Sequence, residues 1–305
     1  MTLGGLIGDT ARRLRAAPLN YGHGTGNPRD EAAFLVLRGL GLPFGTDLDA
    51  SASASQRSRV AALVQRRIRE RMPVAYLLHE AWLGGRAFYV DERAIVPRAF
   101  ISELLPERLR PWLPRQARKA LDLCTGSGCL AVLLARALPR VRVDAADVSA
   151  AALAVARRNI ARHRLGRRVR LVRSDLFSAL RGRRYHLIVS NPPYVPAATM
   201  RALPHEYRHE PRLALAGGGD GLAFVRRILA GARAHLAPGG LLVCEIGDSR
   251  RALERAYPRV PFLWPETSAG AGQVFMLQRE WISAGGRART GAASRARPRL
   301  ARARR

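Results

Sequence analysis

The stretch that decides the fold reads ALDLCTGSGCLAVLLA and spans residues 120–135. Its first four residues form a short run typical of a buried parallel strand, and the apolar residues from Cys129 onward are typical of a helix. Gly126 and Gly128, between the two, let the backbone approach a ligand closely where the amide groups of a helix start become available. Strand, glycine loop and helix in this order predict the first unit of an α/β sheet.

Further strands and helices alternate after this unit. We expect strands at 141–146, 169–173, 187–190 and 241–246, with helices between them. This alternation predicts a doubly wound, mostly parallel, Rossmann-like α/β sheet. Because ligands of such sheets bind beyond the carboxyl ends of the strands, the residues that follow each strand are the candidates for a site.

The ends of the second and third strands carry acids placed for a nucleoside. Asp147 follows the second strand, about 20 residues beyond the glycines, where an acid accepts from the two ribose hydroxyls. Asp175 and Leu176 follow the third strand, where the carboxylate can accept from an adenine amine and the leucine can pack on the ring. In isolation, this pair would be a helix cap and a core leucine.

The glycine loop discriminates between two kinds of cofactor. A dinucleotide is one alternative, but residue 131 is alanine where G-x-G-x-x-G needs glycine, and Cys124 replaces the first glycine of D-x-G-x-G-x-G. Asp122 would repel a pyrophosphate and suits a ligand that carries an ammonium group. We therefore favour S-adenosylmethionine as the cofactor. The expected cofactor-binding residues are Asp122, Cys124, Thr125, Gly126, Ser127, Gly128, Asp147, Asp175, Leu176 and Asn191.

The fourth strand ends in Asn191-Pro192-Pro193-Tyr194. Proline has no N–H to donate and fixes its φ angle, so the strand must stop at Asn191 and the Pro192 carbonyl is held in one orientation. The Asn191 side-chain oxygen and the Pro192 carbonyl can together accept both hydrogens of a planar NH2 group, while Tyr194 lies against its face. We predict Asn191, Pro192 and Tyr194 as catalytic residues, and these three with Pro193 as substrate-binding residues.

Segments outside the strand ends supply weaker candidates. Residues 206–211, EYRHEP, are polar and aromatic, and we interpret them as a substrate-side loop in which His209 contacts the substrate. Arg98 either contacts an anionic part of the cofactor or forms a structural ion pair. His23, in the turn-rich stretch 21–28, could contact a ligand, but an exposed loop histidine without a role is the more frequent case. Residues 217–221 are expected to be a simple turn.

Composition bounds the class of protein. The 305 residues are 25% charged and 48% apolar, with no apolar run near the roughly 18 residues that a membrane span requires. The first residues lack the pattern of a secretory signal, and we expect a cytoplasmic protein. The three cysteines lack C-x-x-C spacing and suggest no metal site. The net charge of +29 indicates a polyanionic partner such as ribosomal RNA, although Lys119 is the only lysine and a general arginine bias gives the same charge.

Periodicity divides the chain into four parts. Residues 1–80 predict a helical domain with helices at 10–17, 30–40 and 54–71, and residues 81–97 predict a hairpin linker. Residues 98–282 make up the α/β domain and open with a helix that carries Ile101 and Leu104. Residues 283–305 contain arginine but no acid and are expected to be a disordered tail.

The motifs DLCTGSG (122–128) and NPPY (191–194) together resemble those of class I S-adenosylmethionine-dependent methyltransferases that modify glutamine amides. The chain is most similar to the ribosomal-protein glutamine N(5)-methyltransferases of the PrmB type, over about residues 20–280. This narrower likeness rests on residues 21–25, 88–93, 123–129 and 206–211. The resemblance implies that a glutamine of large-subunit ribosomal protein three is the substrate and that the N-terminal domain helps to recognise it.

Departures and alternatives accompany this resemblance. Ala99-Phe100 stands where the family pattern has Ser-Pro. Glutamine methylation of peptide chain release factors is an alternative function, and so is DNA adenine-N6 methylation, because an aromatic amine fits the same acceptor pair. The DNA alternative lacks a recognisable DNA-reading motif in the first 80 residues. A ribosome-associated binding module without activity is the non-enzyme alternative.

Overall fold

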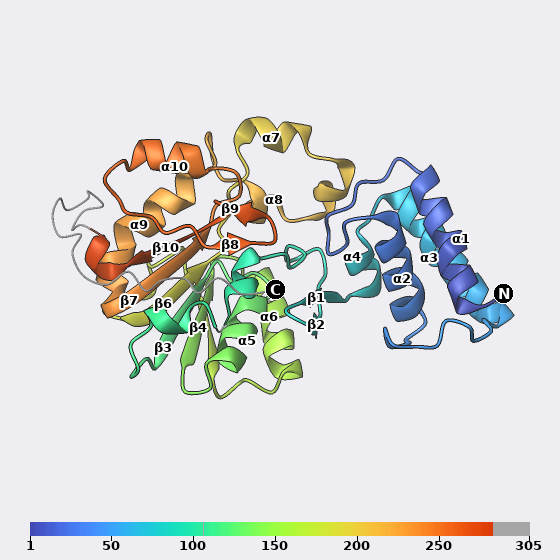
Figure 1. Ribbon diagram of the computed structural model, residues 1–305, viewed down its shortest axis with the longest axis horizontal. Coiled ribbons are helices and arrows are strands. Elements are labelled where there is room, and N and C mark those ends of the chain that lie inside the picture. Colours follow the sequence, from blue (N-terminus) through green and yellow to red (C-terminus); the bar gives the residue numbers. More distant parts are fainter. Residues whose placement is uncertain (106, 283–305) are drawn as a thin grey trace, which may run out of the picture.

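The computed structural model describes residues 1–105 and 107–282, so the tail expected at 283–305 lies outside the described residues. A helical bundle formed by the first helices lies beside a larger α/β unit, and the short hairpin β1–β2 lies between them (Figure 1).

The larger unit is built on a six-stranded sheet with the order β10-β7-β6-β3-β4-β5. Five strands are parallel, and β10 pairs antiparallel with β7 at one edge. The order reverses direction between β3 and β6, which confirms the predicted doubly wound, mostly parallel fold. The strands are β3 (Lys119–Leu123), β4 (Arg142–Asp147), β5 (Val169–Arg173), β6 (Tyr185–Ser190), β7 (Leu236–Glu245) and β10 (Val274–Gln278).

Alternation along the strands divides the core into two layers. In β6, Leu187 and Val189 pack into one hydrophobic cluster, and Ile188 between them packs into the other. The first cluster includes α5 (Cys129–Ala137), and the second includes α9 (Ala223–His235). Because both faces are covered, three consecutive residues of β6, Leu187 to Val189, are apolar and buried.

The N-terminal bundle has a hydrophobic cluster of its own. Its helices are α1 (Leu3–Ala16), α2 (Pro28–Gly39), α3 (Ala54–Glu70) and α4 (Val74–Leu78). Each of the first three begins at a side-chain cap, supplied by Thr2, Asn27 and Ser53 respectively. The Thr2 cap explains why α1 starts seven residues before the predicted Thr10, and the short helix α4 was not predicted.

The connection between the two units differs in part from expectation. The predicted hairpin is present as β1 (Ala81–Leu83) and β2 (Arg86–Phe88), which pair antiparallel. The helix expected after Arg98 is instead a short 3-10 segment, η1 (Phe100–Leu104). It ends at Leu104, and the extended residue Leu105 that caps it precedes a proline in the sequence, where helical conformation is disfavoured.

The remaining elements are helices after β4 and β7, short helical segments between β6 and α9, two further 3-10 segments and a separate two-stranded sheet. They are η2 (Arg110–Trp112), α6 (Ala150–Arg162), α7 (Ala197–Ala202), η3 (His205–His209), α8 (Arg212–Leu215), α10 (Arg250–Ala256), β8 (Glu266–Thr267), β9 (Gly270–Ala271) and η4 (Arg279–Trp281). Of the helices in the described part of the chain, none combines the length and the apolar character that crossing a bilayer requires.

Candidate active site

A cavity of about 250 Å³ opens at the carboxyl ends of β3, β4, β5 and β6. Every one of these four strands contributes residues that were predicted from the sequence. The predicted residues that line the cavity are Cys124, Gly126, Asp147, Asp175, Leu176, Asn191, Pro192, Pro193 and Tyr194. The predicted residues that do not line it are Asp122, Thr125, Ser127, Gly128 and His209.

The loop after β3 is fastened to the end of β4 through Asp147. One carboxylate oxygen of Asp147 accepts from the Gly126 amide and the other from the Ser149 amide, both at 2.9 Å. Burial raises the pKa of Asp147, and these amide bonds oppose the rise. Each oxygen can accept a further hydrogen bond, and Asp147 lines the cavity, which suits a ligand that carries two neighbouring hydroxyl groups.

Asp122 has a different place from the one expected. Its carboxylate is fully buried beneath the loop, where Oδ2 accepts from the Thr125 hydroxyl and Oδ1 has no hydrogen-bond partner among the described residues. Burial raises the pKa of Asp122 to about 7, although the Thr125 bond opposes the rise. Asp122 therefore supports the loop from below and does not face the cavity.

The end of β5 brings an acid and an apolar side chain to the cavity wall. Leu176 is buried, with a left-handed φ of 47°. The half-exposed Asp175 pairs with Arg227 at 2.7 Å. Val148 and Phe224 also line this part, so the wall combines one carboxylate with several apolar surfaces.

The loop after β6 is held by backbone bonds to a second segment. The Val195 amide donates to the Leu215 carbonyl at 2.9 Å, and the Gly217 amide donates to the Val195 carbonyl at 2.8 Å. A Cβ at Gly217 would lie 2.6 Å from the Tyr194 backbone. The glycine-rich stretch 217–221 was expected to be a simple turn, but it is the surface on which the predicted catalytic loop rests.

Tyr194 packs beneath the loop against a residue that the sequence analysis missed. Its hydroxyl lies 3.3 Å from Oε1 of Glu245, and a Cβ on Gly247 would lie 2.8 Å from its ring. Glu245 is fully buried at the end of β7, and burial raises its pKa to about 7, although the Phe100 amide, which donates to Oε2 at 2.9 Å, opposes the rise. An acid at the end of an apolar strand was the signal that could have identified Glu245.

A buried ion pair forms another wall of the cavity. Arg98 donates to both carboxylate oxygens of Glu210 at 2.6 Å, so the ion pair considered for Arg98 is present, and Arg98 also lines the cavity. His23 is 4% exposed, lies 3.7 Å from Glu210 and packs against Tyr207, so the expectation of an exposed loop histidine was wrong. Burial opposes ionisation of Glu210, but Arg98 and His23 lower its pKa to about 2.

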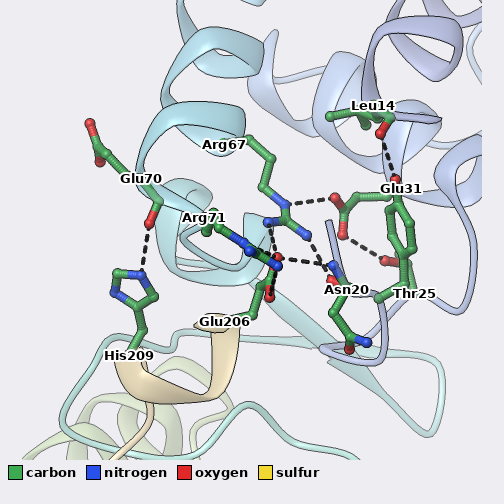
Figure 2. A network of polar contacts seen from close by, with 10 residues as sticks. Leu14, Asn20, Thr25, Glu31, Arg67, Glu70, Arg71, Glu206 and His209 are labelled. Carbon is green, nitrogen blue, oxygen red and sulfur yellow. Dashed lines mark hydrogen bonds and ion pairs between the residues drawn. The ribbon is translucent and has the colours of Figure 1, made fainter. Parts of the chain in front are cut away.

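Glu206 joins the same loop to the helical bundle (Figure 2). Its fully buried carboxylate accepts from the Asn20 amide at 3.0 Å, from Arg67 at 3.3 Å and from Arg71 at 3.1 Å. Burial opposes ionisation of Glu206, yet these donors hold its pKa below the ordinary value. His209 lies at this junction, 3.0 Å from the Glu70 carbonyl, rather than at the cavity.

The site is a small pocket lined by polar and apolar residues. Among residues 1–105 and 107–282, no group of three or more His, Cys, Asp or Glu side chains could hold a metal ion. The cavity wall offers carbonyl and carboxylate acceptors, from Asp147, Asp175, Asn191 and Pro192, beside apolar surfaces. Such a wall can bind a nucleoside and present a planar amide or amine next to it.

Comparison with known proteins shows which family this chain is similar to. The Methyltransferase small domain model matches residues 100–220. A ribosomal protein uL3 glutamine methyltransferase from Bordetella pertussis is 52% identical, over 92% of this chain and 96% of that protein. A relative of the same name from Neisseria meningitidis serogroup B is 50% identical, over 88% of this chain and 90% of that protein. A solved methyltransferase from Pyrococcus furiosus aligns with 74% of this chain and 99% of that chain, at a TM-score of 0.46 and 19% identity.

Proposed function

The chain belongs to the family of ribosomal protein uL3 glutamine methyltransferases, and from this premise we propose that it transfers a methyl group from S-adenosylmethionine to a glutamine side-chain nitrogen of uL3. The observation that carries the proposal is one shared cavity. The Asn191–Pro192 acceptors and the Gly126–Asp147 pair, predicted for substrate and cofactor respectively, both line it.

The residues present fit S-adenosylmethionine. Asp147 has acceptor capacity for the ribose hydroxyls, and Leu176 and Val148 offer apolar surfaces for an adenine ring. Asp175 would accept from the adenine amine, and the backbone at Gly126 leaves room beside it, because a Cβ there would meet only Ile95, at 3.8 Å. When bound, the cofactor supplies an electrophilic methyl group on a sulfonium centre.

Positioning by the chain has to carry much of the catalysis, because an amide nitrogen is a poor nucleophile. The Asn191 side-chain oxygen and the Pro192 carbonyl would accept both hydrogens of the substrate NH2 group. This fixes the nitrogen and favours the positive charge that develops on it. Tyr194 would lie against the amide plane and stabilise that charge through its ring face. No general base is needed before transfer, since the methylated nitrogen can lose its proton afterwards.

The helical bundle is proposed to help recognise the ribosomal protein. Loop 206–211 contributes Tyr207 and Pro211 to the cavity wall and is fastened to the bundle through Glu206. A substrate that enters the cavity beside this loop would therefore meet the bundle as well. His209 would act here through the junction between loop and bundle.

The experiment compares two protein substrates. The full-length chain is incubated with S-adenosylmethionine and either uL3 or a peptide chain release factor, and the products are mapped by mass spectrometry. We expect one methylated glutamine in uL3, and a loss of about 100-fold or more in the Asn191→Ala variant, in line with removal of one hydrogen-bonding group that stabilises a transition state. Circular dichroism and thermal unfolding of the variant control for folding, because Asn191 is also an expected cofactor-binding residue.

Two outcomes would contradict the proposal. Preferential methylation of the release factor would move the function to the alternative substrate. Near-wild-type transfer by a folded Asn191→Ala variant would remove the acceptor pair from the mechanism.

A further inference from the structure

A second hollow, of about 540 Å³, lies at the opposite edge of the sheet. Its lining residues come from the first residues of β3, β4, β5 and β6 and from the segments just before them. Because these strands are parallel, their starts share one edge and their ends share the other. Strands of five or six residues separate this hollow from the candidate active site by roughly 15–20 Å.

The lining of this hollow, which we call the basic edge, is strongly cationic. Six basic side chains face one carboxylate, that of Asp144. The cations are Lys119, Arg142, Arg167, Arg168, Arg170 and Arg183. The candidate active site, in contrast, has two arginines and two aspartates in its wall. A general arginine bias in the composition does not explain why the two ends of the same strands differ in this way.

Half of these cations are fixed by the protein itself. Arg170 and Arg183 donate to Asp144, at 2.8 Å and 3.1 Å. Arg168 donates to the carbonyls of Leu138 and Val141, both at 2.7 Å. These bonds hold three guanidinium groups in place around the hollow.

The other half have no side-chain partner among the residues that the structure describes. Lys119, Arg142 and Arg167 are exposed, and no side-chain hydrogen bond or ion pair of theirs is found within the described ranges. Adjacent strands are about 4.8 Å apart, so cations at the starts of four neighbouring strands extend over roughly 15 Å. Phosphates of one strand follow one another at about 3.4 Å along the axis of a DNA double helix, so a length of roughly 15 Å covers several phosphates of a nucleic acid backbone.

We propose that the basic edge binds the phosphate backbone of RNA while the opposite edge carries out methyl transfer. The guanidinium fork matches phosphate oxygens, and fixed arginines lose little conformational entropy on binding. The choice of RNA rests on the proposed function, because a ribosomal protein is a component of an RNA–protein particle. An enzyme that meets this substrate therefore works near RNA phosphates.

The test uses two full-length triple variants that remove the same charge. One carries Lys119→Gln, Arg142→Gln and Arg167→Gln at the basic edge. The matched control carries Arg251→Gln, Arg255→Gln and Arg259→Gln, which are likewise exposed and have no side-chain partner among the residues described. Both retain residues 283–305, so any contribution of those arginines cancels. Binding of a labelled RNA hairpin is measured by fluorescence anisotropy over a series of salt concentrations.

We expect the basic-edge variant to bind the hairpin at least about tenfold more weakly than the control variant at low salt. Its salt slope should fall by about 2 to 3, since three phosphate contacts are removed. Equal affinities for the two variants would overturn the proposal. A larger loss of binding to phosphatidylserine vesicles or to polyglutamate than to RNA would also overturn it, in favour of a membrane or an acidic protein.

A methyl transfer assay with RNA-free uL3 separates this proposal from the proposed function. Both triple variants should methylate the isolated protein at the wild-type rate, because the substituted residues lie outside the cavity wall. If the wild type transfers no methyl group to uL3, the proposed function fails, and the comparison of RNA affinities still decides whether the basic edge binds RNA.

Discussion

The two ends of the central strands differ in the sign and the burial of their charged side chains. At the carboxyl end, the carboxylates of Asp122 and Glu245 are fully buried and that of Asp147 is partly buried at the cavity, and burial raises the pKa of each. At the amino end, Asp144 is surrounded by arginines that partly face solvent. The same β4 strand contributes to both ends, carrying Asp144 near its start and Asp147 at its end. A strand scaffold can therefore separate a pocket built on buried acceptors from a surface built on exposed cations.

The largest effect expected from the difference between the two ends is the pH dependence of stability that the buried Glu245 causes. Because burial raises its pKa from 4.5 to about 7, the native state favours the neutral acid, and stability falls as the pH rises from about 4.5 through 7. A shift of this size corresponds to about 3 kcal/mol. Glu245→Gln should remove most of this component. Urea unfolding at several pH values measures it, and Asp122, which has a similar pKa, leaves a residual slope in both proteins.

Asp144→Asn is the matched control for this first prediction. The pH dependence of its unfolding free energy between pH 4.5 and 7 should remain like that of the wild type. If the unfolding free energy of Glu245→Gln has the same pH dependence as that of the wild type, ionisation of Glu245 does not account for the loss of stability expected between pH 4.5 and 7.

The next effect concerns the support of the catalytic loop. Gly217→Ala places a methyl group about where the Tyr194 backbone lies, at 2.6 Å, and should displace the loop. A displacement on the order of 1 Å can reduce the rate about 100-fold. We expect a loss of this size in methyl transfer, measured with saturating cofactor. Gly219→Ala is the control, since a Cβ there meets nothing within 4 Å, and equal activities of the two variants would contradict the role of Gly217.

A smaller effect compares the two ends of β4 directly. Asp147→Asn removes a charged acceptor at the cavity and should weaken S-adenosylmethionine binding about tenfold, as expected for a net hydrogen bond to a charged group. Asp144→Asn, near the start of the same strand, should leave the affinity unchanged. Calorimetry measures both dissociation constants. An equal change in the two would mean that Asp147 has no direct contact with the cofactor.

The smallest effect concerns the exposed ion pair at the basic edge. The side chain of Arg170 is 53% exposed while it donates to Asp144, so Arg170→Gln should change the free energy of unfolding by less than about 1 kcal/mol. Thermal unfolding measures this change. If the free energy of unfolding fell by several kcal/mol, the Asp144–Arg170 pair would behave like a buried ion pair and not like an exposed one.

The sequence alone predicted the parts of the site that depend on local chain chemistry. The two prolines after Asn191 end β6 at Ser190, as predicted. Asp147, predicted from its place at the end of its strand, lines the cavity. The alternation of side chains along β3 explains why Asp122 does not line the cavity. Leu121 and Leu123 on either side of it pack into the α9 layer, and the Asp122 side chain is buried beneath the loop. The prediction assigned every residue from Cys124 to Gly128 to the cofactor site, although only Cys124 and Gly126 of this loop line the cavity.

Contacts between distant segments could not be predicted in this way. The burial of His23 depends on Tyr207 and Glu210, which lie in another part of the chain. The role of Gly217 depends on its approach to Tyr194, and nothing in a glycine-rich stretch names the segment that packs against it. These residues need the tertiary structure because their partners are chosen by the fold and not by sequence spacing.

The fastening of Glu206 by Arg67 and Arg71 limits how such proteins can be recombined. A chimera that joins the catalytic unit of this chain to a helical bundle without these two arginines would leave the buried Glu206 carboxylate without its ion-pair partners. Removing a partner from a buried charge costs about 3–5 kcal/mol. Exchange of substrate preference between relatives should therefore proceed by transplanting this ionic cluster together with the bundle, as one module.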